Sequence, residues 1–194
     1  MTKERIVGCR IPYEFFGTRG AGQSDKGPGE DHFETCSYDL ALQDAGIENF
    51  NVVQYTSVIP PEAVEVDEEK ARSLFHHGAV LECIMAKTNG VKGEHITAGV
   101  GRMKVWQKSP RGKTGALVGG FAAEYEGHAS VKKAESLLHE DLMGIFDRRY
   151  TQRTHACGDF EFVIQDLVVD ENYGTVLAAF CFVTYIVPVV EVAR

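Results

Sequence analysis

The stretch that decides how this chain is built reads Glu48-Asn49-Phe50-Asn51-Val52-Val53-Gln54-Tyr55-Thr56-Ser57-Val58-Ile59-Pro60-Pro61. Its β-branched and aromatic residues predict a strand. The proline pair ends that strand, because proline has no N–H to offer to a neighbouring strand. Taken alone, Thr56-Ser57 is a pair of hydroxyl residues near a strand end, which is a common feature with no chemistry attached.

Length and composition indicate one globular domain over residues 1–194. The chain has 194 residues, of which 44% are hydrophobic and 25% charged, enough for a substantial core and against general disorder. The net charge of −8 disfavours nucleic acids and anionic membranes as partners, since both attract basic surfaces. The longest apolar run, residues 176–190, is shorter than a membrane span.

Cysteine and histidine usage predicts neither disulfides nor a metal site. The five cysteines, at 9, 36, 83, 157 and 181, are odd in number and contain no CxxC spacing. Free thiols and an N-terminus without a signal peptide indicate a cytoplasmic protein. The adjacent His76 and His77 point in different directions on an extended chain, so no metal is expected there.

Two helices and several strands are predicted. Asp31–Ala45 is a helix capped by Asp31, with Gly46 at its left-handed end and Phe33, Cys36, Leu40 and Ala41 facing the core. Ser130 caps a second helix that runs to about Tyr150 with a continuous apolar stripe. The predicted strands are Arg5–Tyr13, Ala79–Lys87, Glu94–Gln107, Ala116–Glu126, Asp159–Val169 and Gly174–Val190.

The intervening segments are predicted as loops. Gly17–Gly29 is rich in breakers and is expected to be a flexible loop; its spacing does not match a phosphate-binding loop. Glu62–Phe75 reads as a loop with one helical turn, Asn89-Gly90 as a tight turn, and Ser109–Gly115 as a turn. Gly99 and Gly101 mark bulges or close approaches in their strand. Mostly antiparallel strands with two long helices define the α+β class.

Two blocks of sequence, in order, resemble the pyruvoyl-dependent arginine decarboxylases. The first runs from Asp39-Leu40-Ala41-Leu42 and Ala45-Gly46-Ile47 through Asn51 to Thr56-Ser57-Val58-Ile59-Pro60-Pro61; the second is Ala123-Glu124-Tyr125-Glu126-Gly127 followed by Lys132-Lys133-Ala134-Glu135. The match extends from about residue 30 to the end of the chain. The Thr-Ser junction is most similar to bacterial, chlamydial-type members, whereas archaeal members more often carry Ser-Ser.

The resemblance implies a layered α-β-β-α sandwich, assembled as a homotrimer or a dimer of trimers with active sites between subunits. It also implies self-cleavage between Thr56 and Ser57 into chains 1–56 and 57–194. Ser57 would become a covalent pyruvoyl group, with no pyridoxal phosphate and no metal. That group supplies the electron sink that protein side chains lack for the decarboxylation of L-arginine to agmatine.

Three further residues take roles by the same resemblance. Glu124 matches the proton donor, and apolar neighbours with Glu126 nearby would raise its pKa. Asn51 matches the amide beside the cofactor, which can donate to the oxyanion of the cleavage step. Asp39 matches the carboxylate that binds the guanidinium through two parallel hydrogen bonds. Without the resemblance, each would be an ordinary strand, turn or helix-surface residue.

Several alternatives stay open at the level of sequence. The chain is also compatible with a pyruvoyl enzyme acting on another amino acid, or with a non-catalytic relative that binds a small cation. Thr56 and a longer Asp67–Gly101 region depart from the archaeal pattern and bear on the substrate pocket. Acid resistance and polyamine supply are both compatible physiological roles.

Overall fold

The computed structural model describes residues 5–26, 33–109 and 114–191, and the α+β class is confirmed. The helical segments are a π-helical turn and three α-helices: η1 (Phe33–Ser37), α1 (Tyr38–Asp44), α2 (Glu68–Arg72) and α3 (Val131–Arg149). The strands are β1 (Arg5–Val7), β2 (Ile11–Pro12), β3 (Glu14–Ser24), β4 (Asn51–Gln54), β5 (Val58–Ile59), β6 (Val64–Glu65), β7 (Val80–Val91), β8 (His95–Lys108), β9 (Thr114–Gly127), β10 (His155–Val168), β11 (Tyr173–Phe182), β12 (Tyr185–Ile186) and β13 (Val189–Glu191).

The strands form two main sheets. One has the order β4-β7-β11-β3-β6 and the other the order β10-β8-β9-β5. Most neighbours are antiparallel, as predicted; the pairs β3–β6 and β4–β7 are parallel. The short β4 pairs only with the first four residues of β7, and β5 pairs only with Gly120 and Phe121 of β9.

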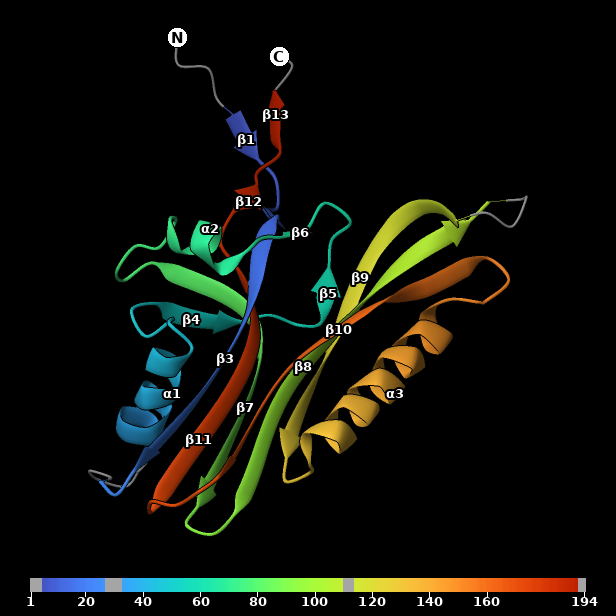
Figure 1. Ribbon diagram of the computed structural model, residues 1–194. Coiled ribbons are helices and arrows are strands. Elements are labelled where there is room, and N and C mark those ends of the chain that lie inside the picture. The colour runs from blue at the N-terminus through green and yellow to red at the C-terminus, as the bar shows by residue number, and fades with distance from the viewer. Residues whose placement is uncertain (1–4, 27–32, 110–113, 192–194) are drawn as a thin grey trace.

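Three hydrophobic clusters hold these elements together. In Figure 1, α1 lies beside the five-stranded sheet and α3 beside the four-stranded sheet. The first lies between the sheets and includes Phe15, Ile84, Ala122 and Phe180. The second packs α1 and its neighbours against the five-stranded sheet, and the third packs α3 against the four-stranded sheet. Burial of these side chains is the main force that holds the elements together.

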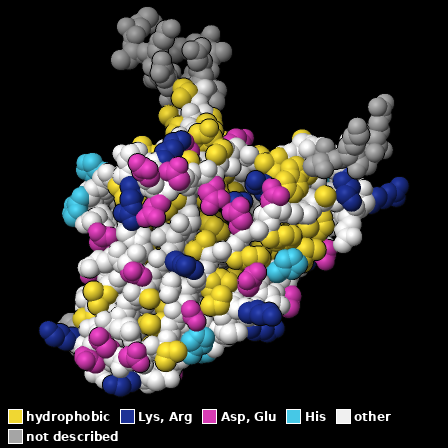
Figure 2. All heavy atoms as spheres, viewed as in Figure 1, with side chains coloured by type: hydrophobic (Ala, Val, Ile, Leu, Met, Phe, Trp, Pro, Cys, Tyr) yellow, Lys and Arg dark blue, Asp and Glu magenta, His cyan; other side chains and the backbone are white. Residues whose placement is uncertain are grey.

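The two ends of the described chain form a ribbon that projects from the body (Figure 1). Strand β1 pairs with β13, and β2 pairs with β12, all antiparallel. Hydrophobic side chains are exposed along this ribbon (Figure 2), among them Val7, Val187 and Val189. The predicted strand Arg5–Tyr13 is therefore two short strands, β1 and β2.

The glycine-rich segment after Phe16 is a strand, so the loop predicted over Gly17–Gly29 is wrong up to Ser24; residues 27–29 lie outside the described part. The glycines are there because α1 lies directly on the strand. A Cβ at Gly20 would come within 2.1 Å of the Ala41 carbonyl oxygen, and one at Gly22 within 2.2 Å of the Ser37 oxygen. They provide close approach between backbones and do not form a turn.

The first helix is shorter than predicted, and Asp31 lies outside the described residues. Chain 33–37 is a wide helical turn and α1 has only seven residues, so α3 is the one long helix of the described chain. Gly46 does adopt a positive φ of 69° after the helix, as predicted. Ala41 is buried as predicted, whereas Leu40 is 41% exposed and does not face the core.

The second helix and most strands are confirmed. The Ser130 hydroxyl accepts from the Lys133 N–H at the start of α3, and Ala134, Leu138, Leu142 and Phe146 are buried. The short helical turn expected within Glu62–Phe75 is α2. Close packing at Gly99 and Gly101 is also confirmed, since a Cβ there would meet Ile164 and Phe162 at 3.0 and 2.7 Å.

One turn and one strand differ from the prediction. Strand β7 continues through Asn89-Gly90 to Val91, and the turn comes at Lys92-Gly93, where Gly93 has a φ of 88°. This turn leads from one sheet into the other and is not a hairpin within a sheet. The predicted strand Gly174–Val190 is divided into β11, β12 and β13.

Within 5–26, 33–109 and 114–191, no helix has the length and apolar character needed to cross a membrane.

Candidate active site

Ser57 lies where the chain crosses between the two sheets (Figure 1). Strand β4 before it belongs to the five-stranded sheet, and β5 after it belongs to the four-stranded sheet. Tyr55 and Thr56 are in neither strand, and Ser57 forms a bend. Thr56 is exposed and Ser57 is half-buried, so the peptide bond between them is held at both ends but accessible.

Two backbone hydrogen bonds fix this junction. The Val58 N–H donates to the Thr56 carbonyl oxygen at 3.0 Å, which makes a three-residue turn centred on Ser57. The Ala122 N–H of β9 donates to the Ser57 carbonyl oxygen, also at 3.0 Å. A hydroxyl therefore stands next to a carbonyl whose oxygen already accepts a hydrogen bond, which is the arrangement that stabilises charge on that oxygen.

Glu124 meets Ser57 at this junction. It lies on β9 two residues after Ala122, on the same face of the strand, which is directed toward the other sheet. Although Glu124 still reaches solvent, burial of part of its side chain raises the pKa of its carboxyl, and the nearby charge of Glu126 raises it further. A hydrogen bond with Ser57 acts in the opposite direction. The expected pKa elevation of Glu124 is thus present.

Glu126 continues the same face of β9 and reaches β7. Its carboxylate accepts a hydrogen bond from the backbone N–H of Lys87 at 2.9 Å. The two acidic side chains are therefore held on one face by different elements, Glu124 toward Ser57 and Glu126 toward β7. After partial burial, the charge of Glu126 is the second cause that raises the pKa of Glu124.

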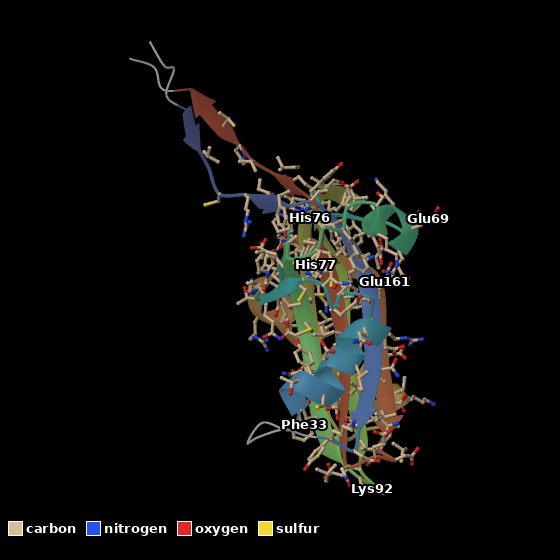
Figure 3. All side chains as sticks on the ribbon, turned by 90° about the vertical axis from the view of Figure 1, so that its left-hand side faces the viewer. Phe33, Glu69, His76, His77, Lys92 and Glu161 are labelled. Atoms are coloured by element: carbon tan, nitrogen blue, oxygen red, sulfur yellow. The ribbon has the colours of Figure 1, made fainter. Side chains whose placement is uncertain are left out.

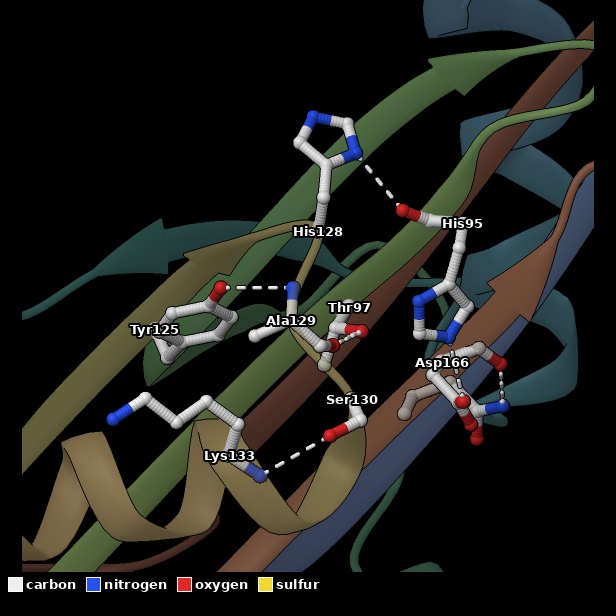
Figure 4. Close-up of polar contacts among 9 residues, drawn as sticks. His95, Thr97, Tyr125, His128, Ala129, Ser130, Lys133 and Asp166 are labelled. Carbon is white, nitrogen blue, oxygen red and sulfur yellow. Dashed lines mark hydrogen bonds and ion pairs between the residues drawn. The ribbon is translucent and has the colours of Figure 1, made fainter.

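The end of β9 is anchored to β8 and to the start of α3 (Figure 4). The Tyr125 hydroxyl accepts from the Ala129 N–H at 3.1 Å, and the Thr97 hydroxyl donates to the Ala129 carbonyl at 2.6 Å. The His128 ring bonds the His95 carbonyl at 2.8 Å. These contacts fix the register of β9, in which Glu124 stands opposite Val100.

Asn51 is the first residue of β4, whereas Ser57 follows the end of that strand. Its side-chain amide donates to the Gly78 carbonyl at 2.9 Å, and the residue is exposed. Three residues of extended chain, about 10 Å, separate Asn51 from Gln54 before the chain turns toward Ser57. The protomer joins Ser57 with Glu124, while Asn51 lies at the other end of β4.

Asp39 lies in the first turn of α1, on the far side of the five-stranded sheet from β5 and β9 (Figure 1). It is exposed, and its carboxylate accepts a hydrogen bond from the Gln43 side chain at 3.1 Å, one helical turn away. A carboxylate that is exposed and so weakly engaged is able to bind a cation.

Glu82 and its partners Tyr55 and Arg10 lie near the junction, and the sequence analysis did not predict a role for them. Glu82 of β7 is 4% exposed, accepts the Tyr55 hydroxyl at 2.6 Å and forms an ion pair with Arg10. One signal was available, because Glu82 interrupts the apolar run Val80–Ala86. The partners lie 27 and 72 residues away in sequence, a separation that no local pattern reports.

A cavity of about 390 Å³ lies next to β5, and its lining includes Ile59 and Pro60, which follow Ser57 in the chain. Glu65, Arg102 and Glu161 are among its lining residues, and Ser57 and Glu124 are not. Arg102 is 5% exposed and donates to both carboxylates, at 2.6 and 2.5 Å. Arg102 stands opposite Ala122 in the sheet, two residues from Glu124, so this ion-pair cluster borders the candidate active site.

His76 and His77 lie on the surface (Figure 3), as the sequence suggested. Their rings contact the His77 carbonyl and the Asn49 side chain, not each other. In the described part of the chain, no group of three or more His, Cys, Asp or Glu side chains is placed to hold a metal ion. All five cysteines are free.

The fold and the Ser57–Glu124 pair fit an enzyme, and comparisons with known proteins identify the family. The family model of pyruvoyl-dependent arginine decarboxylase matches residues 14–187. A protein of Chlamydia abortus called pyruvoyl-dependent arginine decarboxylase AaxB is 38% identical over 197 aligned residues, covering 92% of this chain and 94% of that protein. The protein of the same name from Chlamydia caviae is 36% identical with the same coverage.

An archaeal relative is more distant. Pyruvoyl-dependent arginine decarboxylase 2 of Archaeoglobus fulgidus is 33% identical over 129 residues, which cover 66% of this chain and 77% of that protein. The chain belongs to the pyruvoyl-dependent arginine decarboxylase family, a family of carboxy-lyases. The family name specifies a covalent pyruvoyl group in place of pyridoxal phosphate. The resemblance read from the two sequence blocks is confirmed.

Proposed function

We propose that this protein decarboxylates L-arginine to agmatine and carbon dioxide, with a pyruvoyl group that it makes from Ser57. The observation that carries the proposal is the contact of Ser57 with Glu124, a carboxyl of raised pKa, in a chain of this family. The surroundings of Ser57 suit the group: both flanking carbonyls are held by backbone N–H donors, and Thr56 is open to solvent.

Processing begins at the Thr56–Ser57 peptide. The Ser57 hydroxyl oxygen attacks the Thr56 carbonyl carbon, the C–N bond breaks, and the hydroxyl proton ends on the Ser57 nitrogen, giving an ester. Removal of the Ser57 α-proton then breaks the bond between the ester oxygen and Cβ, which releases Thr56 as a carboxylate. The residue left at 57 tautomerises to an imine, and water replaces its nitrogen, which leaves as ammonia. The Val58 N–H stabilises the Thr56 oxygen during the first step.

In turnover, the pyruvoyl carbonyl supplies the electron sink for the bond to carbon dioxide. Glu124 then holds the proton that replaces the lost carboxylate. A carboxylic acid can do this near neutral pH only if its pKa is raised, which partial burial and Glu126 both achieve.

In this proposal, Asp39 binds the guanidinium group and thereby determines which substrate is preferred. A carboxylate accepts two parallel hydrogen bonds from a guanidinium, and an ammonium group cannot copy that fork. Because Asp39 and Asn51 both lie away from the Ser57 of their own protomer, we propose that they serve the Ser57 site of a neighbouring protomer. The assembly is a trimer of α-β-β-α sandwiches, or two such trimers.

The test begins with the intact mass of the purified protein. Wild-type chain is expected to separate into fragments 1–56 and 57–194, the second with a ketone in place of its N-terminal amine. Ser57→Ala is expected to remain a single chain without activity. A single wild-type chain that borohydride and substrate fail to label would overturn the pyruvoyl proposal.

A second measurement addresses the substrate and the assembly. Carbon dioxide release is compared for arginine, ornithine, lysine and histidine; arginine is expected to be preferred, and preference for another amino acid would redirect the proposal to that substrate. Sedimentation at several protein concentrations gives the oligomer, with a multiple of three expected. A fully active monomer would contradict a shared site.

A further inference from the structure

Tyr55, two residues before Ser57, is held by a buried carboxylate. The Tyr55 hydroxyl donates to one oxygen of Glu82 at 2.6 Å, and Arg10 pairs with the other. The Glu82 side chain is 5% exposed, while that of Arg10 is 54% exposed. Burying a carboxylate this deeply costs free energy unless both of its oxygens have partners. The Tyr55 hydroxyl and Arg10 therefore both stabilise the buried Glu82.

The remainder of Tyr55 is fixed to the same sheet. Its backbone N–H donates to the Cys83 carbonyl at 2.7 Å, and its ring packs on Phe182 with 5.8 Å between centroids. The Arg10 guanidinium stacks over Tyr185, 5.0 Å from the ring centroid, in the adjoining part of the core. Tyr55 is therefore anchored by backbone, ring and hydroxyl to β7 and its neighbours.

Ser57 is anchored to the opposite sheet, through the bond from the Ala122 N–H to its carbonyl. The one residue between these two anchors is Thr56, whose carbonyl carbon is the point of attack. Its oxygen accepts from the Val58 N–H at 3.0 Å. Fixing Tyr55 and Ser57 on two sheets thus determines how the Thr56 carbonyl is turned relative to the Ser57 hydroxyl.

We propose that Glu82, acting through the Tyr55 hydroxyl, is a positioning residue for cleavage of the Thr56–Ser57 bond. This inference rests on the proposed function and adds a part of the protein that its family membership does not assign. Intramolecular attack depends strongly on the orientation of the two reacting groups, and Glu82 restricts that orientation from one side. Glu82 touches neither reacting atom.

The experiment follows cleavage in time in freshly synthesised chain, by intact mass. Tyr55→Phe keeps the ring and removes only the hydroxyl, and is expected to slow cleavage about tenfold, the effect of one hydrogen bond to a charged group. Glu82→Met, similar in size but with no acceptor, is expected to be at least as slow. Glu82→Gln keeps an oxygen for Tyr55 and is expected to recover part of the rate.

The matched control is Glu161→Gln, which weakens a bond of 2.5 Å to the buried Arg102 and leaves the contacts of Glu82 with Tyr55 and Arg10 in place. Unfolding in urea is measured for each variant in the uncleaved Ser57→Ala background. Slow cleavage in Tyr55→Phe, with Glu161→Gln equally stable but fast, supports positioning. Wild-type rates in Tyr55→Phe and Glu82→Met, or equal slowing in Glu161→Gln, would overturn it. A wild-type chain that never cleaves would instead refute the proposed function itself.

Discussion

Two carboxyl groups of raised pKa, Glu124 on β9 and Glu161 on β10, lie on the two strands that flank β8 and differ in what surrounds them. Burial raises the pKa of both. Glu161 has Arg102 at 2.5 Å and shares it with Glu65, so its charge is compensated within the fold. Partial burial and the charge of Glu126 raise the pKa of Glu124, and its hydrogen bond with Ser57 lowers it.

In the proposed mechanism, that difference separates a structural carboxyl, Glu161, from a reactive one, Glu124. A perturbed pKa by itself is found in ion-pair networks as well as in active sites. An acidic group of raised pKa that is hydrogen-bonded to a nucleophilic hydroxyl is consistent with a proton-transfer role. Substitution of each carboxyl in turn tests this distinction.

The largest contrast is expected between Glu124→Gln and Glu161→Gln. The first should lower kcat with arginine by about 10²–10⁴-fold, the range for a positioned general acid. The second should leave kcat within about twofold, since its partner is Arg102 and not the substrate. Steady-state carbon dioxide release, normalised to the amount of cleaved chain, gives both values. Comparable losses in the two variants would remove the distinction between the carboxyls.

A third carboxylate, Asp39, lies on α1, and its hydrogen bond comes from the Gln43 side chain of the same helix. Asp39→Ala is expected to lower kcat/KM for arginine by about 2–5 kcal/mol, the scale of leaving a charged partner unpaired. Gln43→Ala is the matched control, because it removes the hydrogen bond to Asp39 and leaves the carboxylate in place. An unchanged kcat/KM in Asp39→Ala would make Asp39 a helix-surface charge.

Much of this site was predictable, and the exceptions have a physical cause. Pro60-Pro61 follows the end of β5 and Ser130 starts α3, because caps and breakers act within a few residues. The single strand predicted before the proline pair is wrong, since β4 and β5 belong to different sheets. The glycines of β3 were misread because their role is to admit α1, which the local pattern does not contain. Glu82 was missed for the same reason, since Arg10 and Tyr55 come from other elements.

The Arg102 cluster should affect stability more than chemistry. Arg102→Met removes bonds to both glutamates and is expected to lower the free energy of unfolding by about 1.5–3 kcal/mol, while the chain still cleaves. Urea unfolding in the Ser57→Ala background, at fixed protomer concentration, measures the loss. Lys104→Met, which breaks the more exposed pair with Asp159 at 3.3 Å, should change it by about 0.5 kcal/mol or less. Blocked cleavage in Arg102→Met would extend the site to this cluster.

The smallest expected effect concerns Glu126, the like charge near Glu124. Glu126 raises the pKa of Glu124, so Glu126→Gln, which removes the charge but keeps an oxygen for the Lys87 N–H, should lower that pKa. A proton donor acts only while protonated, and its rate falls as pH rises through its pKa. The alkaline limb of the kcat–pH profile should therefore move to lower pH in Glu126→Gln, with no change in Glu140→Gln on the surface of α3. A limb that stays in place, or moves to higher pH, would show that Glu126 does not set the proton affinity of the donor.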